Sequence, residues 1–455
     1  MMTAVRQPPS VEPISLASLL LMRRRTDRSG LLARLEEAAR LGDIVQIPLA
    51  GRTITFINHP DYIKHVLVDN HANYRKGRAL QAARAVVGNG LLTSEGDFHQ
   101  RQRRMIQPAF HKKRIATYAD VMLNRTQNQM AHWKDGSSVD LHHEMMTLTM
   151  RIVAECLFDV DVSSDAKVLG AALETFLAHF SLLDASPLGQ RLARLPLPRS
   201  IQRRRAMKTL DDAIYHFITQ RRLLSQDELN ERDDLLSMLL AAVDEEADGD
   251  RMTNQQVRDE VMTLFLAGHE TTANALSWTF YLLMQHPQIA SQHIAELDAV
   301  LGDRAATVED LPRLKYNRMV FSEAMRLYPP AWSIGRRAVQ ADEIGGYPIA
   351  PGSTVLMSQW VMHHDERYWN EPQLFRPERF DPDTLHNRPR YAYFPFGGGP
   401  RLCIGEPFAW MEGELLLATI AQKWRFTLKP GVTVQPEPII TLRLKGGFPV
   451  TTRAR

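Results

Sequence analysis

The sequence predicts a mostly α protein with small β-sheets, an α+β class. Helical patterns of apolar residues dominate from about Asp61 until well past the middle of the chain. Short β-branched runs at 43–47, 52–57 and 354–357 predict strands toward both ends. No Pro-, Gly- or Ser-rich linker interrupts the pattern, so we expect one mixed domain covering residues 43–455.

Composition limits the classes of partner and site. A formal net charge of +3 in 455 residues does not by itself indicate nucleic acid, and we expect no nucleic-acid partner. The two cysteines, Cys156 and Cys403, lie far apart and form no C-x-x-C motif. A disulfide framework and a zinc site are therefore not expected, whereas a reducing compartment is.

Residues 1–42 are predicted to be an N-terminal extension without a membrane anchor. The Leu-rich run 14–22 is too short for a membrane span, which needs roughly 20 apolar residues. Its arginines, at 23–25, follow the apolar part, which is the reverse of a signal peptide. We therefore expect a soluble, cytoplasmic protein.

The most distinctive stretch is a glycine-rich loop, Phe-Gly-Gly-Gly-Pro-Arg-Leu-Cys-Ile-Gly at 396–405. Three glycines without a Cβ predict a loop that comes very close to a flat partner. Pro407 suits the first turn of a helix, so Cys403 is expected at a helix N-terminus. The helix dipole and the nearby charge of Arg401 there favour a thiolate. An axial ligand to iron is the best fit for such a cysteine.

Other roles for this cysteine have weaker support in the sequence. A lone intracellular cysteine is commonly a small buried hydrophobe, and a nucleophilic one needs a base nearby, which one sequence does not show. The glycine run is similar to an esterase oxyanion loop, but the chain has no G-x-S-x-G motif. Phosphate binding is weakly supported, because no Lys-Ser or Lys-Thr follows the glycines.

A long helix is predicted over Thr253–His286. Thr253 and Gln256 form a capping box, and about 33 helical residues would span roughly 50 Å. The helix is apolar nearly all round, as expected for a buried element.

The middle of this helix, Ala-Gly-His-Glu-Thr-Thr at 267–272, breaks the apolar pattern. Gly268 is unfavourable there by about 1 kcal/mol relative to Ala, and a buried Glu270 needs a partner or a role. A satisfied polar patch in the core is one interpretation. The other is a locally loosened helix in which Glu270 and Thr271 hold water and pass protons.

Two further patterns are weaker alone. Glu323 and Arg326 have the i,i+3 spacing of common surface ion pairs. The segment 96–114 is strongly basic, and a solvated helix face explains most of it. Within that segment His99 and Arg103 share one helix face because they are four residues apart.

Together these motifs resemble the cytochrome P450 family. The pattern F-x-x-G-x-R-x-C-x-G at 396–405 is similar to its haem-ligating signature, and 267–272 is similar to its A-G-x-[DE]-T-T oxygen-activation motif. Glu323 and Arg326, with Arg379 as third member, resemble the family's E-x-x-R lock that holds the cysteine loop. The resemblance runs from about residue 43 to the C-terminus, with the motifs in the family's order.

The resemblance implies the cytochrome P450 fold, with haem b (iron protoporphyrin IX) between the long helix and the cysteine loop. Cys403 would be the proximal ligand to the haem iron. Glu270 would relay protons and Thr271 would steer oxygen activation. Arg336 is favoured over Arg337 as a propionate contact, on its spacing to 345–346. The remaining expected cofactor contacts are His99, Arg103, Ala267, Phe396 and Arg401.

The implied activity is monooxygenation of a hydrophobic substrate, such as a fatty acid or a terpenoid, with dioxygen. Because the chain ends soon after the cysteine loop, we expect electrons from a separate ferredoxin or flavodoxin with an NAD(P)H-dependent reductase. We expect a monomer. The segments 77–92, 181–197 and 332–334 are expected to line the substrate pocket. A haem-thiolate peroxygenase or isomerase and a non-catalytic haem sensor are the alternatives.

Overall fold

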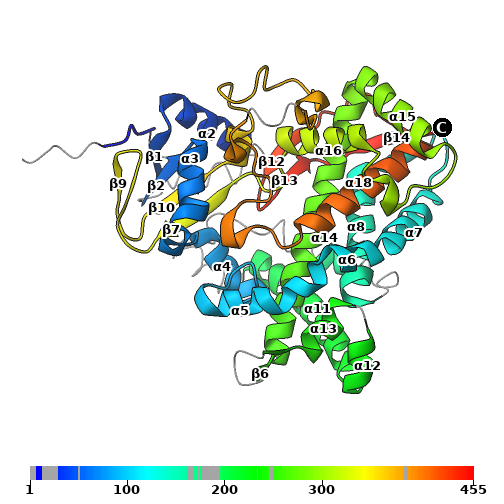
Figure 1. Cartoon of the computed structure of the whole chain (residues 1–455), viewed down its shortest axis with the longest axis horizontal. Coiled ribbons are helices and arrows are strands. Elements are labelled where there is room, and N and C mark those ends of the chain that lie inside the picture. Colours follow the sequence, from blue (N-terminus) through cyan, green and yellow to red (C-terminus); the bar gives the residue numbers. More distant parts are fainter. Residues whose placement is uncertain are drawn as a thin grey trace, which may run out of the picture. The chain divides into compact units, whose positions relative to one another are not determined.

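Helices make up most of the fold and small sheets accompany them, as the sequence predicts (Figure 1). The computed structural model describes residues 7–12, 29–49, 52–160, 168–172, 175, 195, 197–232, 234–244, 250–383 and 388–455. The chain divides into two compact units. The unit that we call the sheet unit comprises Met1–Ala79, Ser322–Cys403 and Thr433–Lys445. The helical unit comprises Leu80–Phe321, Ile404–Val432 and Gly446–Arg455.

A five-stranded sheet in the order β1-β2-β10-β7-β3 organises the sheet unit. Strand β10 runs parallel to β2, and the other neighbours are antiparallel. The strands predicted at 43–47, 52–57 and 354–357 are confirmed as β1, β2 and β10. The bounds are Ile44–Leu49 (β1), Arg52–Ile57 (β2), Tyr74–Lys76 (β3), Ile334–Ala338 (β7) and Thr354–Met357 (β10). Two hairpins accompany the sheet: Asp342–Ile344 (β8) with Tyr347–Ile349 (β9), and Gln435–Pro438 (β12) with Leu442–Lys445 (β13).

Both faces of this sheet are buried. Ile44 and Ile57 are register partners and contribute to one apolar cluster, whereas Val45 and Phe56 are the next pair and contribute to the other. This division follows from the alternation of side chains along a strand. Helix α2 (Ser29–Leu41) supplies three buried residues to the second cluster. The remaining helical elements of the sheet unit are Pro60–Lys64 (α3), the π-turn His65–Asp69 (η1), His71–Asn73 (η2), Gln359–Met362 (α17), Pro377–Phe380 (η6), Arg390–Ala392 (η8) and Gly399–Arg401 (η9).

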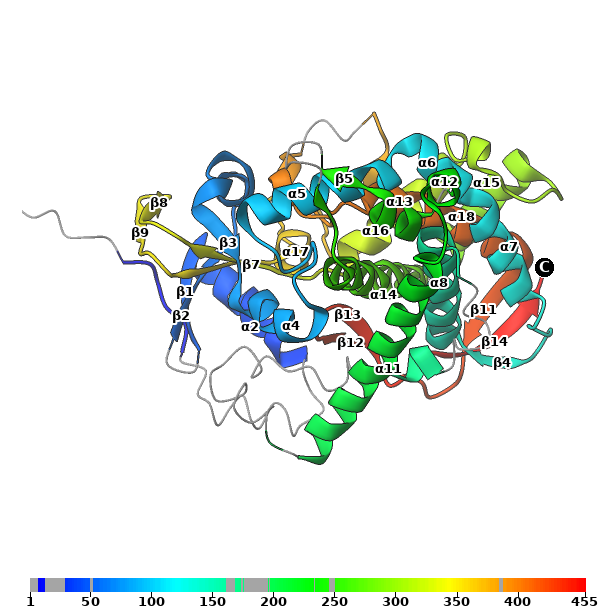
Figure 2. The ribbon, with the colours of Figure 1, turned by 90° about the horizontal axis from the view of Figure 1, so that it is seen from below.

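The long helix predicted at Thr253–His286 is α14 (Asn254–Gln285), with Thr253 as its N-cap and the predicted capping box present. It packs against α8, α11, α13 and α18 in the helical unit, and α8 lies beside it (Figure 2). A Cβ on Gly268 would come within 3.0 Å of Val153 in α8. The mid-helix glycine therefore permits the close approach of two helices.

The other helices of the helical unit are Gly96–Ile106 (α5), Gln107–Phe110 (η3), Lys112–Thr117 (α6), Ala119–Met130 (α7), Leu141–Phe158 (α8), Pro198–Arg221 (α11), Gln226–Glu231 (α12), Leu235–Ala241 (α13), Pro287–Leu301 (α15), Val308–Asp310 (η5) and Glu406–Lys423 (α18). Its strands are Ser138–Asp140 (β4), Val243–Asp244 (β5), Asp250–Arg251 (β6), Trp424–Leu428 (β11) and Pro449–Ala454 (β14). Helices α4 (Arg78–Val87) and α16 (Lys315–Leu327) cross the division between the units. In the described ranges, no helix has both the length and the apolar character that a membrane span requires.

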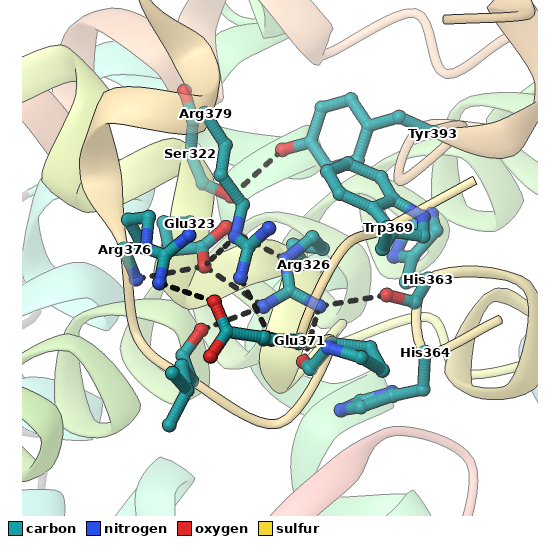
Figure 3. Close-up of polar contacts among 12 residues, drawn as sticks. Ser322, Glu323, Arg326, His363, His364, Trp369, Glu371, Arg376, Arg379 and Tyr393 are labelled. Carbon is teal, nitrogen blue, oxygen red and sulfur yellow. Dashed lines mark hydrogen bonds and ion pairs between the residues drawn. The ribbon is translucent and has the colours of Figure 1, made fainter. Parts of the chain in front are cut away.

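Arg326 of α16 anchors a polar cluster in the core of the sheet unit (Figure 3). Its side chain is fully buried, and all five of its N–H donors are used. Nε and Nη2 donate to the Glu323 carboxylate at 2.6 and 2.8 Å. The remaining donors reach the backbone carbonyls of His363, Pro372 and Leu374. The predicted i,i+3 pair is thus a buried structural element, not a surface pair.

Glu323 also binds Arg379, the third predicted member of this cluster. Its Oε1 accepts from Nε of Arg379 at 3.2 Å and from the backbone N–H of Arg376 at 2.9 Å. Arg379 in turn donates to the backbone carbonyls of Asn370 and Glu371. One carboxylate therefore ties α16 to the segment that precedes the cysteine loop.

His363 extends the cluster to the cysteine loop. Its carbonyl accepts from Arg326, and its ring Nε2 accepts from the backbone N–H of Phe394 at 3.1 Å. Acceptance at Nε2 requires a neutral ring with the proton on Nδ1. Burial, followed by the charges of His364 and Arg326, holds the pKa of His363 well below its usual range. A neutral histidine therefore fixes the backbone two residues before Phe396.

Helix α18 carries a buried acid into the helical core. Glu412 is fully buried, and burial raises its pKa to about 8, although the Thr272 hydroxyl of α14 opposes the shift. Burial, with the charges of Glu412 and Glu155, also raises the pKa of Cys156 in α8. Near neutral pH, Glu412 is therefore an uncharged polar group between these helices.

We expect Arg326→Lys to destabilise the fold severely, because an ammonium cannot replace five fixed donors around a buried carboxylate. Breaking a buried pair of this kind typically costs about 3–5 kcal/mol of unfolding free energy. Urea unfolding followed by circular dichroism measures the loss. The control is Arg376→Gln, whose side chain makes a partly exposed pair with Glu371. A variant at Arg326 as stable as this control would contradict the role of the cluster.

We expect Glu412→Gln to stabilise the protein increasingly as pH rises. An unfolded glutamate ionises near pH 4.5, whereas Glu412 stays protonated to about pH 8, so stability of the native chain falls across this window. The advantage of the variant should reach a few kcal/mol, since one pKa unit corresponds to about 1.4 kcal/mol. Urea titrations at several pH values test this, with exposed Glu231→Gln as control. A pH-independent difference between Glu412→Gln and the native chain would refute it.

Candidate active site

Cys403 lies at the end of the glycine loop, two residues before Gly405, the N-cap of α18. Its backbone N–H donates to the carbonyl of Phe396 at 3.1 Å, which closes the loop. The Cys403 side chain is exposed, whereas Cys156, the other free cysteine, is buried in α8. The predicted position of an accessible thiol at a helix start is thus present in the structure.

The loop glycines are needed for backbone conformation and for close contacts within the chain. Gly397 and Gly399 have φ values of +80° and +67°, a conformation that side chains other than glycine rarely adopt. A Cβ on Gly398 would lie 2.7 Å from the ring of Tyr391, and one on Gly399 would lie 1.8 Å from the carbonyl oxygen of Leu67. Two of these glycines are therefore required by contacts with the chain itself, and the close approach of the loop to a flat partner stays a prediction.

Strand β7 places Arg336 on the face of the sheet that the loop packs against. Ile334, two residues earlier on the same face, lies 3.3 Å from the position of a Cβ on Gly397. Arg336 is buried, and its register partner is Lys76 of β3, which is buried as well. Two cations on one face repel unless an anion is near, so this position suits an anionic group. Sequence reasoning missed Lys76, because its proximity depends on strand pairing.

Arg337 belongs to the opposite face of the sheet. It is the register partner of Arg75, which is exposed. Burial, followed by the charges of Arg52 and Arg337, lowers the pKa of Arg78. This separation of faces supports the preference for Arg336 over Arg337.

Arg401 is held from strand β3. Its Nη1 donates to the backbone carbonyl of Tyr74 at 2.6 Å, and its side chain is half-buried. Arg336, Phe396, Arg401 and Cys403 thus belong to a single unit, in which the sheet and the cysteine loop pack together.

The segment 267–272, which contains Glu270 and Thr271, interrupts the burial of α14. Between Val257 and Leu283 the only exposed residue is Ala267, and Thr271, one turn further, is half-exposed. Glu270 is buried. The helix therefore has a small open face beside a buried carboxyl group.

The structure differs from the interpretation of a locally loosened helix at this segment. It continues without a break through 267–272, and Thr271 Oγ donates to the carbonyl of Ala267 at 2.9 Å. Thr149 of α8 donates to the carbonyl of His269 at 2.9 Å. The hydroxyl of Thr271 reaches the carbonyl four residues back in its own helix, and the hydroxyl of Thr149 reaches His269 from the neighbouring helix, so neither contact opens α14.

His99 and Arg103 lie one turn apart on α5, as predicted. His99 is buried with Nδ1 3.1 Å from Ser94 Oγ, and Arg103 is half-exposed. They belong to the helical unit, together with Ala267, Glu270 and Thr271.

The expected pocket segment 77–92 is partly clamped to α14. The backbone N–H groups of Asn89 and Leu91 donate to the carboxylates of Asp259 and Glu260 at 2.7 and 2.8 Å. Sequence reasoning missed this acidic pair. Of the expected segment 181–197, all but residues 195 and 197 lie outside the described residues.

These residues fit a haem. An exposed thiol supplies the sulfur ligand, and two buried cations on the neighbouring sheet face suit anionic propionates. The exposed Ala267 leaves an apolar position on α14 where a flat ring can lie.

Comparison with known proteins agrees with these features. The model of the family "Cytochrome P450" matches residues 8–447. Cyclooctatin synthase of Streptomyces melanosporofaciens is 39% identical over 406 residues, covering 88% of this chain and 86% of the relative. Pentalenene oxygenase of Streptomyces avermitilis is 34% identical over 403 residues, with 88% of each chain covered. The crystal structure of the cytochrome P450DA heme domain superposes with a TM-score of 0.87 at 25% identity, covering 100% of this chain and 99% of that chain. The chain is therefore an enzyme of the cytochrome P450 monooxygenase family, with the family's fold.

Proposed function

We propose that this enzyme binds haem b through Cys403 and inserts one oxygen atom from dioxygen into a hydrophobic substrate. The observation that carries the proposal is the exposed Cys403 thiol in a closed glycine loop at the start of α18. When bound, the haem supplies the activation of dioxygen. The protein supplies the ligand, the orientation of the cofactor and the delivery of protons.

Basic side chains are proposed to bind the propionates. Arg336 and Arg401 come from the sheet unit, and His99 and Arg103 from the helical unit. Lys76 is added to this set because it pairs in register with Arg336. Phe396 and Ala267 would contact the ring as apolar neighbours.

Glu270 and Thr271 would manage the protons. Glu270 is buried, so its carboxyl group can carry a proton where bulk water is excluded. Thr271 Oγ donates to Ala267 and keeps its lone pairs as acceptors. A water molecule that carries a proton from Glu270 can therefore donate a hydrogen bond to Thr271 Oγ and be held beside the open face of α14.

The substrate is proposed to be a terpenoid. The relatives named cyclooctatin synthase and pentalenene oxygenase are terpenoid oxygenases. Ala267 and the apolar residues of the expected pocket segments agree with a hydrophobic ligand.

Electrons are proposed to come from a ferredoxin or flavodoxin with an NAD(P)H-dependent reductase. Arg104 of α5 and Lys112 and Lys113 of α6 are exposed, and such a basic surface suits an acidic donor protein. We place the enzyme in the cytoplasm, in keeping with its two free cysteines.

We expect Cys403→Ser to abolish the thiolate signature of the haem. A serine oxygen does not replace the electron-rich sulfur, so the reduced, carbon monoxide-bound protein should lose its red-shifted Soret band. Cys156→Ala is the control and should keep the band, because that cysteine is buried in α8. A Cys403→Ser protein that keeps the band would sink the assignment.

We expect Thr271→Ala to bind haem and substrate but to lose coupling, so that electrons leave as hydrogen peroxide instead of product. Glu270→Gln should slow oxygen activation, because an amide cannot release the proton. Removal of a positioned acid or base typically costs about 10²–10⁴-fold in rate. Product, peroxide and reductant are measured in one reaction.

The matched control is Thr279→Ala, since Thr279 Oγ makes the same bond four residues back, to Ala275 at 2.7 Å. Full coupling in Thr271→Ala together with full rate in Glu270→Gln would favour a peroxygenase or a haem sensor.

A further inference from the structure

Asp342, the first residue of β8, collects two side-chain hydrogen bonds on a single carboxylate oxygen. Its Oδ2 accepts from the hydroxyl of Tyr74 at 2.5 Å and lies 2.9 Å from Nε2 of His65. A carboxylate only accepts, so the histidine nitrogen is the donor. The backbone N–H of Glu343 donates to Oδ1 at 2.9 Å, which fixes the carboxylate plane.

The three side chains are shielded from water to different degrees. Tyr74 is fully buried, and the side chains of Asp342 and His65 are 11% and 33% exposed. Burial, together with the bond to Asp342, raises the pKa of Tyr74, so its phenol remains a donor throughout the physiological range. Charge-assisted bonds in such surroundings are stronger than exposed ones.

Both partners of Asp342 belong to segments that touch the cysteine loop. The backbone carbonyl of Tyr74 accepts from Nη1 of Arg401 at 2.6 Å. His65 begins the π-turn η1, whose Leu67 carbonyl oxygen occupies the position of a Cβ on Gly399. The Asp342 carboxylate thus connects β3, which contacts Arg401, with η1, which contacts Gly399.

We propose that Asp342 is a positioning residue for the haem ligand. Through Tyr74 and His65 it holds β3 and η1 against residues 399–401, and this contact fixes Cys403 two residues further along the chain. The inference rests on the proposed function, in which Cys403 ligates the iron. Outer-shell partners of this kind orient metal ligands in many metalloproteins.

The geometry separates this role from general packing. The Tyr74→Phe substitution removes the side-chain hydroxyl but keeps the ring and the backbone carbonyl that accepts from Arg401. Glu343, the next residue of β8, is exposed and provides a control of the same charge. The test variants are Tyr74→Phe and Asp342→Ala, and the control is Glu343→Ala.

The experiment uses the full chain loaded with haem. We measure the fraction of the reduced, carbon monoxide-bound protein that keeps the thiolate Soret band, and the rate of haem transfer to an excess of apomyoglobin. Circular dichroism monitors the fold. In Asp342→Ala the thiolate fraction should fall, and haem release should accelerate about tenfold relative to Glu343→Ala.

Tyr74→Phe should move both readouts in the same direction by a smaller factor. The double variant should be no worse than Asp342→Ala, since the two residues act through one contact. If Asp342→Ala does not fold, Tyr74→Phe decides the matter alone. Band fractions and release rates within about twofold of the control would overturn the inference, because outer-shell losses are larger. A native chain without a thiolate band would instead overturn the proposed function, and with it this inference.

Discussion

The proposed function places one constraint on the structure: the sulfur atom of Cys403 must be held in place by a loop that does not pair with a strand. The loop meets this constraint by packing. Gly399 adopts a positive φ and presses against the carbonyl of Leu67, and Gly398 lies against the ring of Tyr391. Any side chain at these positions would displace the loop, so glycine here specifies one conformation instead of providing freedom.

Support reaches this loop from both ends within the sheet unit. On the side where the chain enters, buried Arg326 holds the carbonyl of His363, whose neutral ring accepts from Phe394. On the side where it leaves, Arg401 is bound to β3. The contacts before the loop include the fully buried ion pair between Arg326 and Glu323. The contacts after the loop include the partly exposed His65. The entering side therefore contributes more of the rigidity, because burial protects its bonds from competition with water.

Local chemistry explains what the sequence predicted well. The capping box at Thr253, the strand at 354–357 and the helix start after Gly405 depend on neighbours within a few residues. The supporting residues depend instead on distant pairing. Arg401 lies 327 residues from Tyr74, and Asp342 lies 277 residues from His65. No spacing rule connects such positions, since strand register and loop packing decide which of them meet.

Helix α14 shows how a buried element can also carry chemistry. A polar segment in a core usually carries a penalty, because each buried polar group must find a partner. In α14 some of these partners come from the helix itself, since the Thr271 hydroxyl donates to the carbonyl of Ala267. Another comes from α8, where the Thr149 hydroxyl donates to the carbonyl of His269. Gly268 turns its bare Cα toward α8, so the close packing of the two helices continues past the motif. Within the buried part of α14 the side of the helix that carries Ala267 and Thr271 is the open one, and Glu270 lies next to it without any break in the helix. A regular helix, and not a loosened one, thus satisfies the demands of packing at the residues that we propose for proton transfer.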